Sequence, residues 1–333
     1  TPCGTLFPYT TLFRSLGIPS EGPLLRSLRC VTWYSDDPVF YSKVKSGSFN
    51  EQDHVYWMER TWGSLLGPIA PERSGFLPVA GSVPREGEDI EHFRHPVTFV
   101  GSILDTRPAI EALARPERDS VMKQVDRLMA GESVSLLDSA RDIELTGSGV
   151  DTIERTLGSI RKQPLQGLPA VAYFLYTVAN AEKRIRFLSP LVPLGLHVYG
   201  TTAWGTLLPG IPHDRVHGSV GGEEIVDLYR STLVNIGIHS YQCPTALSQR
   251  DFNVLLSGGC LVADWVADCE SGLIEPGRHA AFVRNAESLT DTVQELIEDE
   301  PKRREMAEAG KRHVAQHHTY EQRTQEILRR LES

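Results

Sequence analysis

Short apolar runs that end at glycine or serine recur along the second half of the chain and predict buried strands. Four of them are VTFVGS from Val97, LGLHVYG from Leu194, DRVHGSVG from Asp214 and LVNIGIHS from Leu233. Residues 108–186 have a largely helical pattern, and Glu223–Ser231 is amphipathic. This alternation over Val97–Gln316 predicts a doubly wound parallel sheet with its ligand beyond the carboxyl ends of the strands.

The stretch Gln249–Asp264, QRDFNVLLSGGCLVAD, is the most informative part of that pattern. It predicts a helix over Arg250–Ser257, a turn at Gly258-Gly259 and a buried strand over Cys260–Asp264. Glycines let the backbone approach a ligand closely, and a helix that starts near Ser248 offers free N–H groups to an anion. From spacing alone, a plain helix-to-strand turn in an α/β core explains the same residues.

The first part of the chain predicts a second, smaller α/β region. Leu28–Tyr34, Asp53–Met58 and Ser74–Gly81 have the pattern of three strands, as in the last part of a sheet whose early strands are missing. We therefore expect a partial domain over 16–81, a charged linker over 82–95 and a second domain over 96–317. Residues 318–333 form a terminal helix, which begins with Thr319 and Gln322 at capping-box spacing.

Residues 1–15 are set aside as an artefactual leader. Thr5–Ser15, TLFPYTTLFRS, matches the in-frame translation of a widely used short-read sequencing adapter. We expect that the natural protein starts upstream and that its N-terminal part is missing from this chain.

Composition and charge exclude several classes. The 333 residues carry a formal net charge of −9, which argues against nucleic-acid binding through a basic face. No apolar run approaches the length of a transmembrane segment, and no signal peptide is recognisable. Five cysteines form no C-x-x-C pair, so reduced thiols in a cytoplasmic protein are expected.

The order and spacing of several pieces carry a family resemblance. They are WYSDDP, FLPVAG, VTFVGS, HVYG-x3-W, VHGSVGGEEIVDLYRS, QRDFNVLLSGGCLVAD, GLIEPGRHAAFVRNAESL and KRHVAQHHTYEQR. Over about Cys30–Leu331 the chain resembles glycosyltransferases of the GT-B fold, particularly the CgeB-like (spore maturation protein) group. The resemblance implies two Rossmann-like domains, with the acceptor in the first and a nucleotide-sugar donor in the second. It also implies a terminal helix that crosses back to the first domain, and catalysis without a bound metal or other cofactor.

The resemblance also implies donor-site residues. Arg107 stands where related retaining enzymes have the lysine of a G-R-x4-K pattern, and Asn253 stands where an E-x7-E motif has its second glutamate. Arg250 is a second diphosphate candidate. A solvated residue and a surface salt bridge are the structural alternatives for the two arginines. Trp204 either stacks on a base or packs internally. The other donor-side candidates are Gly101, Ser102, Gly200, Gly218, Val220, Gly258 and Gly259.

Acceptor-side chemistry has two candidates, Asp36 and His54, each with a structural alternative. Asp37 followed by Pro38 is typical of a helix start, whereas Asp36 is a candidate general base. His54, at a strand start, is either an acid/base group or a structural histidine. No third ligand is spaced near the aspartate pair, so no metal site is expected.

The resemblance implies a glycosyltransferase, of hexosyltransferase type, that moves a sugar from a nucleotide-diphosphate donor to a hydroxyl of a glycan, lipid-linked or protein acceptor. Because part of its cleft is missing, this chain is expected to be inactive. A GT-B nucleotide-sugar epimerase and a non-catalytic nucleotide- or glycan-binding scaffold are the alternatives.

Overall fold

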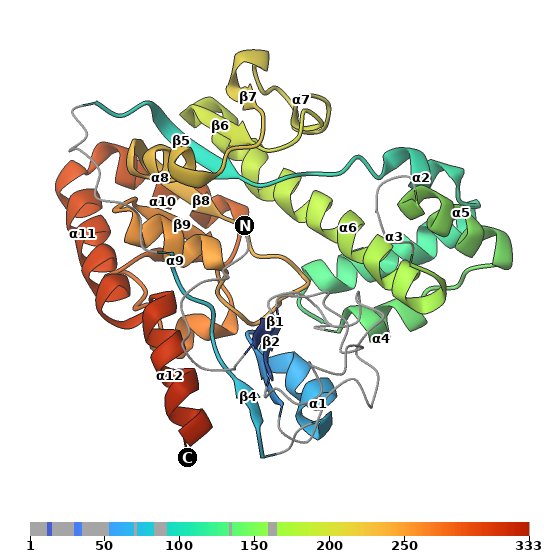
Figure 1. The fold of residues 1–333 in the computed structure, drawn as a ribbon. Helices are drawn as coiled ribbons and strands as arrows, with labels where there is room; N and C mark the ends of the chain where they lie inside the picture. Colours follow the sequence, from blue (N-terminus) through green and yellow to red (C-terminus); the bar gives the residue numbers. More distant parts are fainter. Residues whose placement is uncertain are drawn as a thin grey trace. The chain divides into compact units, whose positions relative to one another are not determined.

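The computed structural model describes residues 12–14, 30–34, 53–69, 72–82, 92–132, 135–158 and 165–332 (Figure 1). The chain divides into two units, residues 1–78 and residues 79–333, and each is described here by itself. The predicted linker over 82–95 lies largely outside the described residues.

A parallel sheet with the strand order β1-β2-β3-β4 forms the first unit. Its strands are β1 (Leu12–Arg14), β2 (Cys30–Tyr34), β3 (His54–Trp57) and β4 (Ser74–Phe76). All four residues of the inner strand β3 are buried, as is usual for a parallel strand covered on both faces. Three short helices follow β3: η3 (Arg60–Trp62), α1 (Gly63–Leu66) and η4 (Gly67–Ile69).

Strand β1 bears on one expectation from the sequence. Leu12–Arg14 belongs to the segment that we set aside, yet it pairs in parallel with β2, with Leu12 opposite Cys30. Extended backbone at a sheet edge needs only matching N–H and C=O groups, so the pairing does not depend on where the segment comes from. The artefactual origin of residues 1–15 stays a prediction.

A six-stranded parallel sheet forms the centre of the second unit, in the order β10-β9-β8-β5-β6-β7. Its strands are β5 (His95–Val100), β6 (Leu196–Tyr199), β7 (Val216–His217), β8 (Thr232–Gly237), β9 (Leu261–Asp264) and β10 (Ala281–Val283). Numbered within this unit, the order is 3-2-1-4-5-6, which is that of a Rossmann sheet. The predicted α/β class and doubly wound parallel sheet are confirmed.

Helices connect and cover these strands. Before β6 come α2 (Arg107–Ala112), α3 (Arg115–Met129), α4 (Leu136–Arg141), α5 (Gly147–Gly158), α6 (Gly167–Leu188) and η5 (Ser189–Leu194). The later ones are α7 (Trp204–Leu207), η6 (His213–Arg215), α8 (Gly222–Arg230), α9 (Gln249–Leu256), η7 (Ala267–Glu270), α10 (Ala286–Glu298), α11 (Glu300–His317) and α12 (Tyr320–Glu332). None of the helices in the described part is both long and apolar enough to cross a membrane.

Two groups of helices position the site. In Figure 1, α2–α5 gather around the first part of α6, away from the sheet, and the last part of α6 lies against the sheet. There Leu188 joins a buried cluster with Val97, Phe99 and Leu196. Burying apolar strand faces under helices is the main stabilising contribution in such a layer.

The terminal helix α12 begins with the predicted capping box. The Gln322 side chain accepts hydrogen bonds from the Thr319 N–H at 2.7 Å and from the Thr319 hydroxyl at 2.9 Å. Thr319 also forms a parallel bridge with Gly81, so the start of α12 is joined to the segment just after residue 78.

Candidate functional site

The carboxyl edge of the second sheet contains its topological switch point. Strand β5 lies between β8 and β6, and the chain continues in opposite directions from this pair. Open parallel sheets bind their ligands beyond the carboxyl ends of the strands at such a point. Gly101 directly follows β5, and His239 lies two residues after the end of β8. The candidate site is therefore built from the loops that follow these strands.

Backbone packing holds the loops after β5 and β6 together. Gly200 has a φ of +157°, and a Cβ there would lie 2.5 Å from the Gly101 carbonyl oxygen, so only glycine fits. The same oxygen accepts a hydrogen bond of 2.8 Å from the indole N–H of Trp204. The Thr201 hydroxyl donates to the Ile103 carbonyl at 2.6 Å. These contacts give the edge a fixed backbone.

Two arginines from different helices meet at this edge. Arg184 of α6 and Arg250 of α9 lie with their guanidinium carbons 5.7 Å and 5.5 Å from the centre of the Phe99 ring. Arg184 donates to the Ser102 carbonyl, and Arg250 hydrogen-bonds Tyr229. Burial, together with the charge of Arg250, lowers the pKa of Arg184 to about 10.

Neither arginine of this pair forms a salt bridge with a carboxylate within the described part of the chain. Like charges held close together in a partly buried place repel each other, and a bound anion relieves that repulsion. Guanidinium groups donate in a fork that matches the oxygens of a phosphate. The start of α9, whose N-cap is Ser248, adds free N–H groups beside Arg250. This arrangement suits a phosphate or diphosphate.

A buried chain of charges fixes the start of α9 to the sheet. The two ring nitrogens of His239 lie 2.8 Å from Asp251 Oδ2 and 2.8 Å from Asp264 Oδ1. Lys183 Nζ lies 2.6 Å from Asp264 Oδ2 and donates to the His239 carbonyl at 2.9 Å. Asp251 accepts from the Ser248 N–H at 2.7 Å, so it also caps the helix.

The charges of this network follow from its geometry. Burial alone would lower the pKa of His239, but the carboxylates of Asp251 and Asp264 raise it to about 10. Burial would raise the pKa of Asp264, but Lys183 and His239 hold it well below its usual range. The ring of His239 is therefore an imidazolium that donates from both nitrogens. Its role is to orient the start of α9, and with it Arg250.

A cavity of about 410 Å³ adjoins this network at the carboxyl ends of β8, β9 and β10. Lys183, His239 and Asp264 contribute to its wall, and Arg186 and Arg284 add positive charge. Arg284 lies over the Trp265 ring, 4.3 Å from its centre. None of the site residues that we predicted from the sequence lines this cavity.

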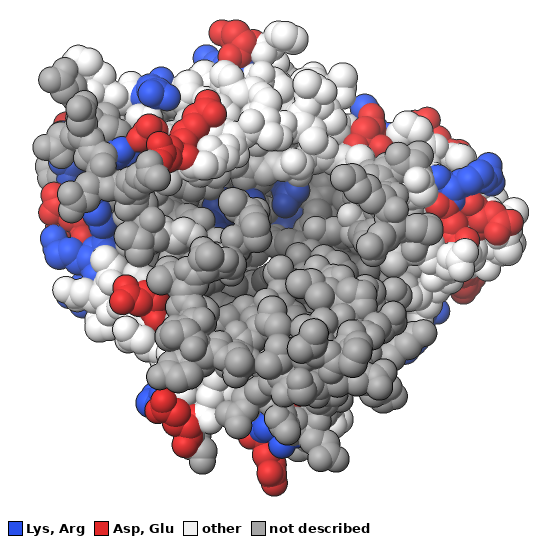
Figure 2. Space-filling view, viewed as in Figure 1, with Lys and Arg blue, Asp and Glu red and all other residues white. Residues whose placement is uncertain are grey.

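The charged side chains on the face shown in Figure 2 are mixed. Acidic and basic groups alternate over the described surface of that face, with basic atoms also visible near its centre. No continuous basic patch covers the described surface in this view, in keeping with the net charge of −9.

The glycine pair of the stretch Gln249–Asp264 has a structural role at the end of a helix. Gly258 and Gly259 close the carboxyl end of α9. The Gly258 N–H donates to Leu255 and the Gly259 N–H to Val254, which is a Schellman motif, with Gly258 at a φ of +82°. The pair precedes β9 and so lies at the amino edge of the sheet. The expected ligand edge is at the other end of α9, and a donor-binding role for these glycines stays a prediction.

Three further donor-side candidates have other partners. Trp204 is fully buried, so its ring packs against Phe99 and is not free to stack on a base. Arg107 is exposed and pairs bidentately with Asp105, at 2.9 Å and 2.7 Å. The Asn253 side-chain oxygen accepts from the Ser82 N–H at 2.9 Å.

The other donor-side candidates lie at the carboxyl edge. Gly101 and Gly200 pack against each other, and the Ser102 carbonyl accepts a hydrogen bond from Arg184. Gly218 and Val220 follow β7, and Ser219 between them donates to the Gly200 carbonyl at 3.3 Å. Their part in binding stays a prediction.

On the acceptor side, His54 is the first residue of β3, at the amino end of its strand, and it is buried. That end of a parallel sheet is not where ligands usually bind. Asp36 lies outside the described residues. Both roles stay predictions.

Sequence reasoning did not single out Arg184, Lys183 or His239. The two basic residues lie within a long helix and belong to no motif, so no local pattern marks them. His239 did carry a signal, since it closes an apolar strand run at the predicted ligand edge. A group of three histidines, His95, His197 and His217, was also missed, and it is the one group of the described residues that could hold a metal ion.

The family comparison matches a part of the second unit. A family described as glycosyl transferase-like matches residues 182–329, which is less than half of the 333 residues. That range includes Arg184, His239 and Arg250. A search of curated proteins found no match.

Solved structures resemble the chain only distantly. The sucrose-phosphate synthase of Thermosynechococcus elongatus is 11% identical with a TM-score of 0.47, over 91% of this chain and 67% of that one. HepE of Anabaena, in complex with UDP-glucose, is 12% identical with a TM-score of 0.48, over 93% and 73%. The T4 phage β-glucosyltransferase is 10% identical with a TM-score of 0.45, over 91% and 73%.

Proposed function

We propose that the protein is a glycosyltransferase of the GT-B type that takes its sugar from a nucleotide-diphosphate donor. The donor binds to residues 79–333, at the carboxyl edge of the sheet. The match of residues 182–329 to the glycosyl transferase-like family supports this proposal, because that range contains both arginines of the edge. So does the resemblance of Cys30–Leu331 to the CgeB-like group.

The observation that carries the proposal is the arginine pair at the switch point. When the bond between the sugar and the diphosphate breaks, negative charge develops on the leaving phosphate oxygens. Arg184, Arg250 and the N–H groups at the start of α9 stabilise that charge, and groups already held in place do so without reorganising. Lys183 is not part of this set, since Asp264 neutralises it at 2.6 Å.

The His239 network supports the same site indirectly. Asp251 and Asp264 clamp His239 from both sides, and Asp251 caps α9 one residue after Arg250. A displaced helix start would misplace both its N–H groups and the Arg250 guanidinium. His239 is therefore a positioning residue.

We assign the acceptor side to residues 1–78, with Asp36 and His54 as its candidates and a hydroxyl of a glycan, lipid-linked or protein acceptor as substrate.

Donor binding tests this proposal directly, because it does not depend on turnover. UDP, GDP and ADP are titrated calorimetrically, each beside its monophosphate. We expect at least one diphosphate to bind more tightly than its monophosphate. Arg184→Gln and Arg250→Gln should each weaken that binding about ten- to a hundredfold, as for the loss of a charge-assisted hydrogen bond of about 1.5–3 kcal/mol.

Arg107→Gln is the matched control for that experiment. Arg107 belongs to the same unit and follows β5 by seven residues, but its guanidinium is already paired with Asp105. Its replacement should leave the affinity unchanged. Binding that ignores both Arg184 and Arg250, or that follows Arg107 instead, would contradict the proposal. Interconversion of a free nucleotide sugar, in place of its hydrolysis or transfer, would favour an epimerase.

A further inference from the structure

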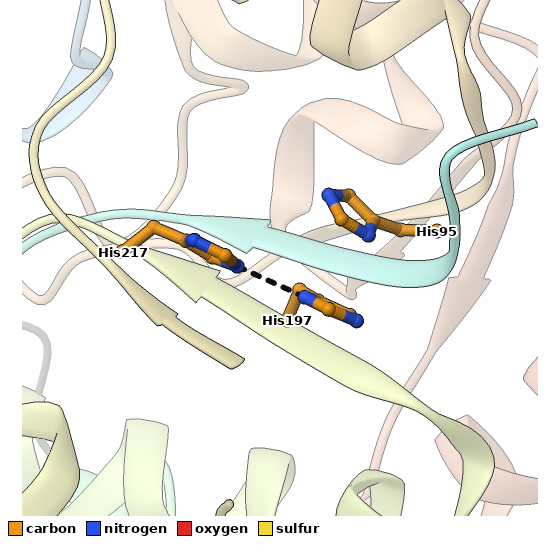
Figure 3. A group of neighbouring side chains, drawn as sticks. All are labelled: His95, His197 and His217. Carbon is orange, nitrogen blue, oxygen red and sulfur yellow. Dashed lines mark hydrogen bonds between the residues drawn. The ribbon is translucent and has the colours of Figure 1, made fainter. Parts of the chain in front are cut away.

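Three histidines from three neighbouring strands converge on one side of the second sheet (Figure 3). They are His95 of β5, His197 of β6 and His217 of β7. One ring nitrogen of each lies within 4.8 Å of those of the other two, and His197 Nδ1 and His217 Nε2 are 2.9 Å apart. The His95 ring stacks on that of His197 with 3.8 Å between centroids.

The hydrogen bonding of His95 leaves one of its nitrogens unused. Its Nε2 lies 2.8 Å from the Tyr199 hydroxyl oxygen. Its Nδ1 is buried and has no hydrogen-bond partner among the described residues. Histidines that bind metals have this arrangement, in which one nitrogen is held by an outer partner and the other keeps its lone pair for the ion.

We propose that His95, His197 and His217 form a binding site for a divalent transition-metal ion of the Zn²⁺ class, with water as the fourth ligand. Three imidazoles and one open position form a common zinc ligand set. This site is separate from the arginine pair, and it stands whether or not the protein is a glycosyltransferase.

The geometry needs only a small adjustment. Zinc lies about 2.0–2.1 Å from each histidine nitrogen, so tetrahedral ligand nitrogens are about 3.3 Å apart. The ligand nitrogens already lie within 4.8 Å of one another, and rotation of the side chains about their two torsions can close the remaining gap. The Tyr199 hydroxyl, 2.8 Å from His95 Nε2, serves as the outer partner of His95. The ion would tie β5, β6 and β7 to one another.

Metal titration of the full chain, freed of any histidine tag, tests the site. We expect Zn²⁺ to bind at one ion per chain in calorimetry, and Co²⁺ to give the visible absorption of a tetrahedral nitrogen-ligated ion. A Zn²⁺ concentration of 100 times Kd should raise Tm by about 5–10 °C. His197→Ala and His217→Ala should abolish all three signals. Tyr199→Phe should weaken binding about ten- to a hundredfold, because it removes the outer partner.

His313→Ala is the matched control. His313 is also half-buried and stacked on another histidine, His279, with 4.1 Å between centroids, but its Nε2 is hydrogen-bonded to the Leu273 carbonyl. This variant should keep the full metal response. Zinc binding that survives both His197→Ala and His217→Ala, or that is lost in His313→Ala alone, would overturn the proposal. Tyr199→Phe and His197→Gln, checked by circular dichroism, provide the test should an alanine variant fail to fold.

Discussion

Replacement of His239 by glutamine is the sharpest test of the buried network. Glutamine keeps a polar side chain but removes the positive charge between Asp251 and Asp264. Asp264 keeps Lys183, whereas Asp251 loses its closest cation while remaining buried. Breaking a buried ion pair by removing one partner costs about 3–5 kcal/mol, because the remaining charge is left uncompensated. At about 2–4 °C per kcal/mol for a unit of this size, Tm should fall by roughly 6–20 °C near pH 6.5.

The pH dependence distinguishes this mechanism from general damage to the core. The pKa of His239 rises from 6.5 in the unfolded chain to about 10 in the native protein. Between these values the native state binds more protons, so its stability is full below pH 6.5 and is lost as pH rises. The slope is about 1.4 kcal/mol per pH unit, or about 3 kcal/mol between pH 6.5 and 8.5.

Thermal unfolding followed by far-UV circular dichroism measures this slope, since helices α2 to α12 lie in residues 79–333. Comparison of the wild type with His239→Gln over pH 6.5 to 8.5 isolates His239. The pKa values of His95, His197, His217, His279 and His318 are all lowered, so these rings add stability as pH rises from 6.5, equally in both proteins. The thiols of Cys260 and Cys269 have pKa values raised to about 12, and their contribution is likewise common to both proteins.

We expect the wild-type Tm to fall by roughly 6–12 °C across the window relative to that of His239→Gln. His213→Gln serves as the control, because His213 is an exposed histidine of the same unit and should leave the wild-type pH dependence intact. A His239→Gln variant whose Tm follows the wild-type pH dependence would refute the imidazolium assignment.

Three further predictions concern stability. Gly258→Ala should cost about 1–2 kcal/mol of unfolding free energy, because the φ of +82° at Gly258 is unfavourable for alanine. Denaturant titration measures this loss. An equal loss in Gly218→Ala, where a Cβ meets open space, would show that the backbone angle of Gly258 is not its cause. Thr319→Ala should cost about 1 kcal/mol by removing the α12 cap, and an unchanged denaturation midpoint would argue against that cap. Burial and Arg323 lower the pKa of His318 to about 3, so this ring contributes stability that is lost as pH falls below 6.5; His318→Gln should flatten the decrease in Tm between pH 6.5 and 4, and a variant as acid-sensitive as the wild type would count against it.

The stretch Gln249–Asp264 illustrates how far local pattern reaches. The predicted helix and strand lie within one residue of α9 and β9, because apolar spacing and glycine position determine both. The same pattern cannot say which end of a helix faces a ligand. Gly258 and Gly259 lie beside the amino edge of the sheet, whereas Arg250 lies beside its carboxyl edge. Of the site predicted in this stretch, only the part around Arg250 is therefore at the ligand edge.

The site itself depends on residues that are distant in sequence. Arg184 and Arg250 meet over Phe99 because α6 ends against β5 and α9 starts beside it. His239, Asp251 and Asp264 become one charge network because parallel strands bring their carboxyl ends to one edge. The three histidines of β5, β6 and β7 are a further instance, since neither spacing nor a motif links His95 to His197 and His217.

By itself the sequence determined the α/β class, the doubly wound parallel sheet, the capping box of α12 and the edge at which a ligand is expected. Periodicity, glycine positions and helix caps are local properties, and local sterics and hydrogen bonding decide them. Only the tertiary structure decided which side chains share that edge, which are buried, and which charges lack a partner. Those properties arise from strand order and helix packing over distances along the chain that no local pattern encodes.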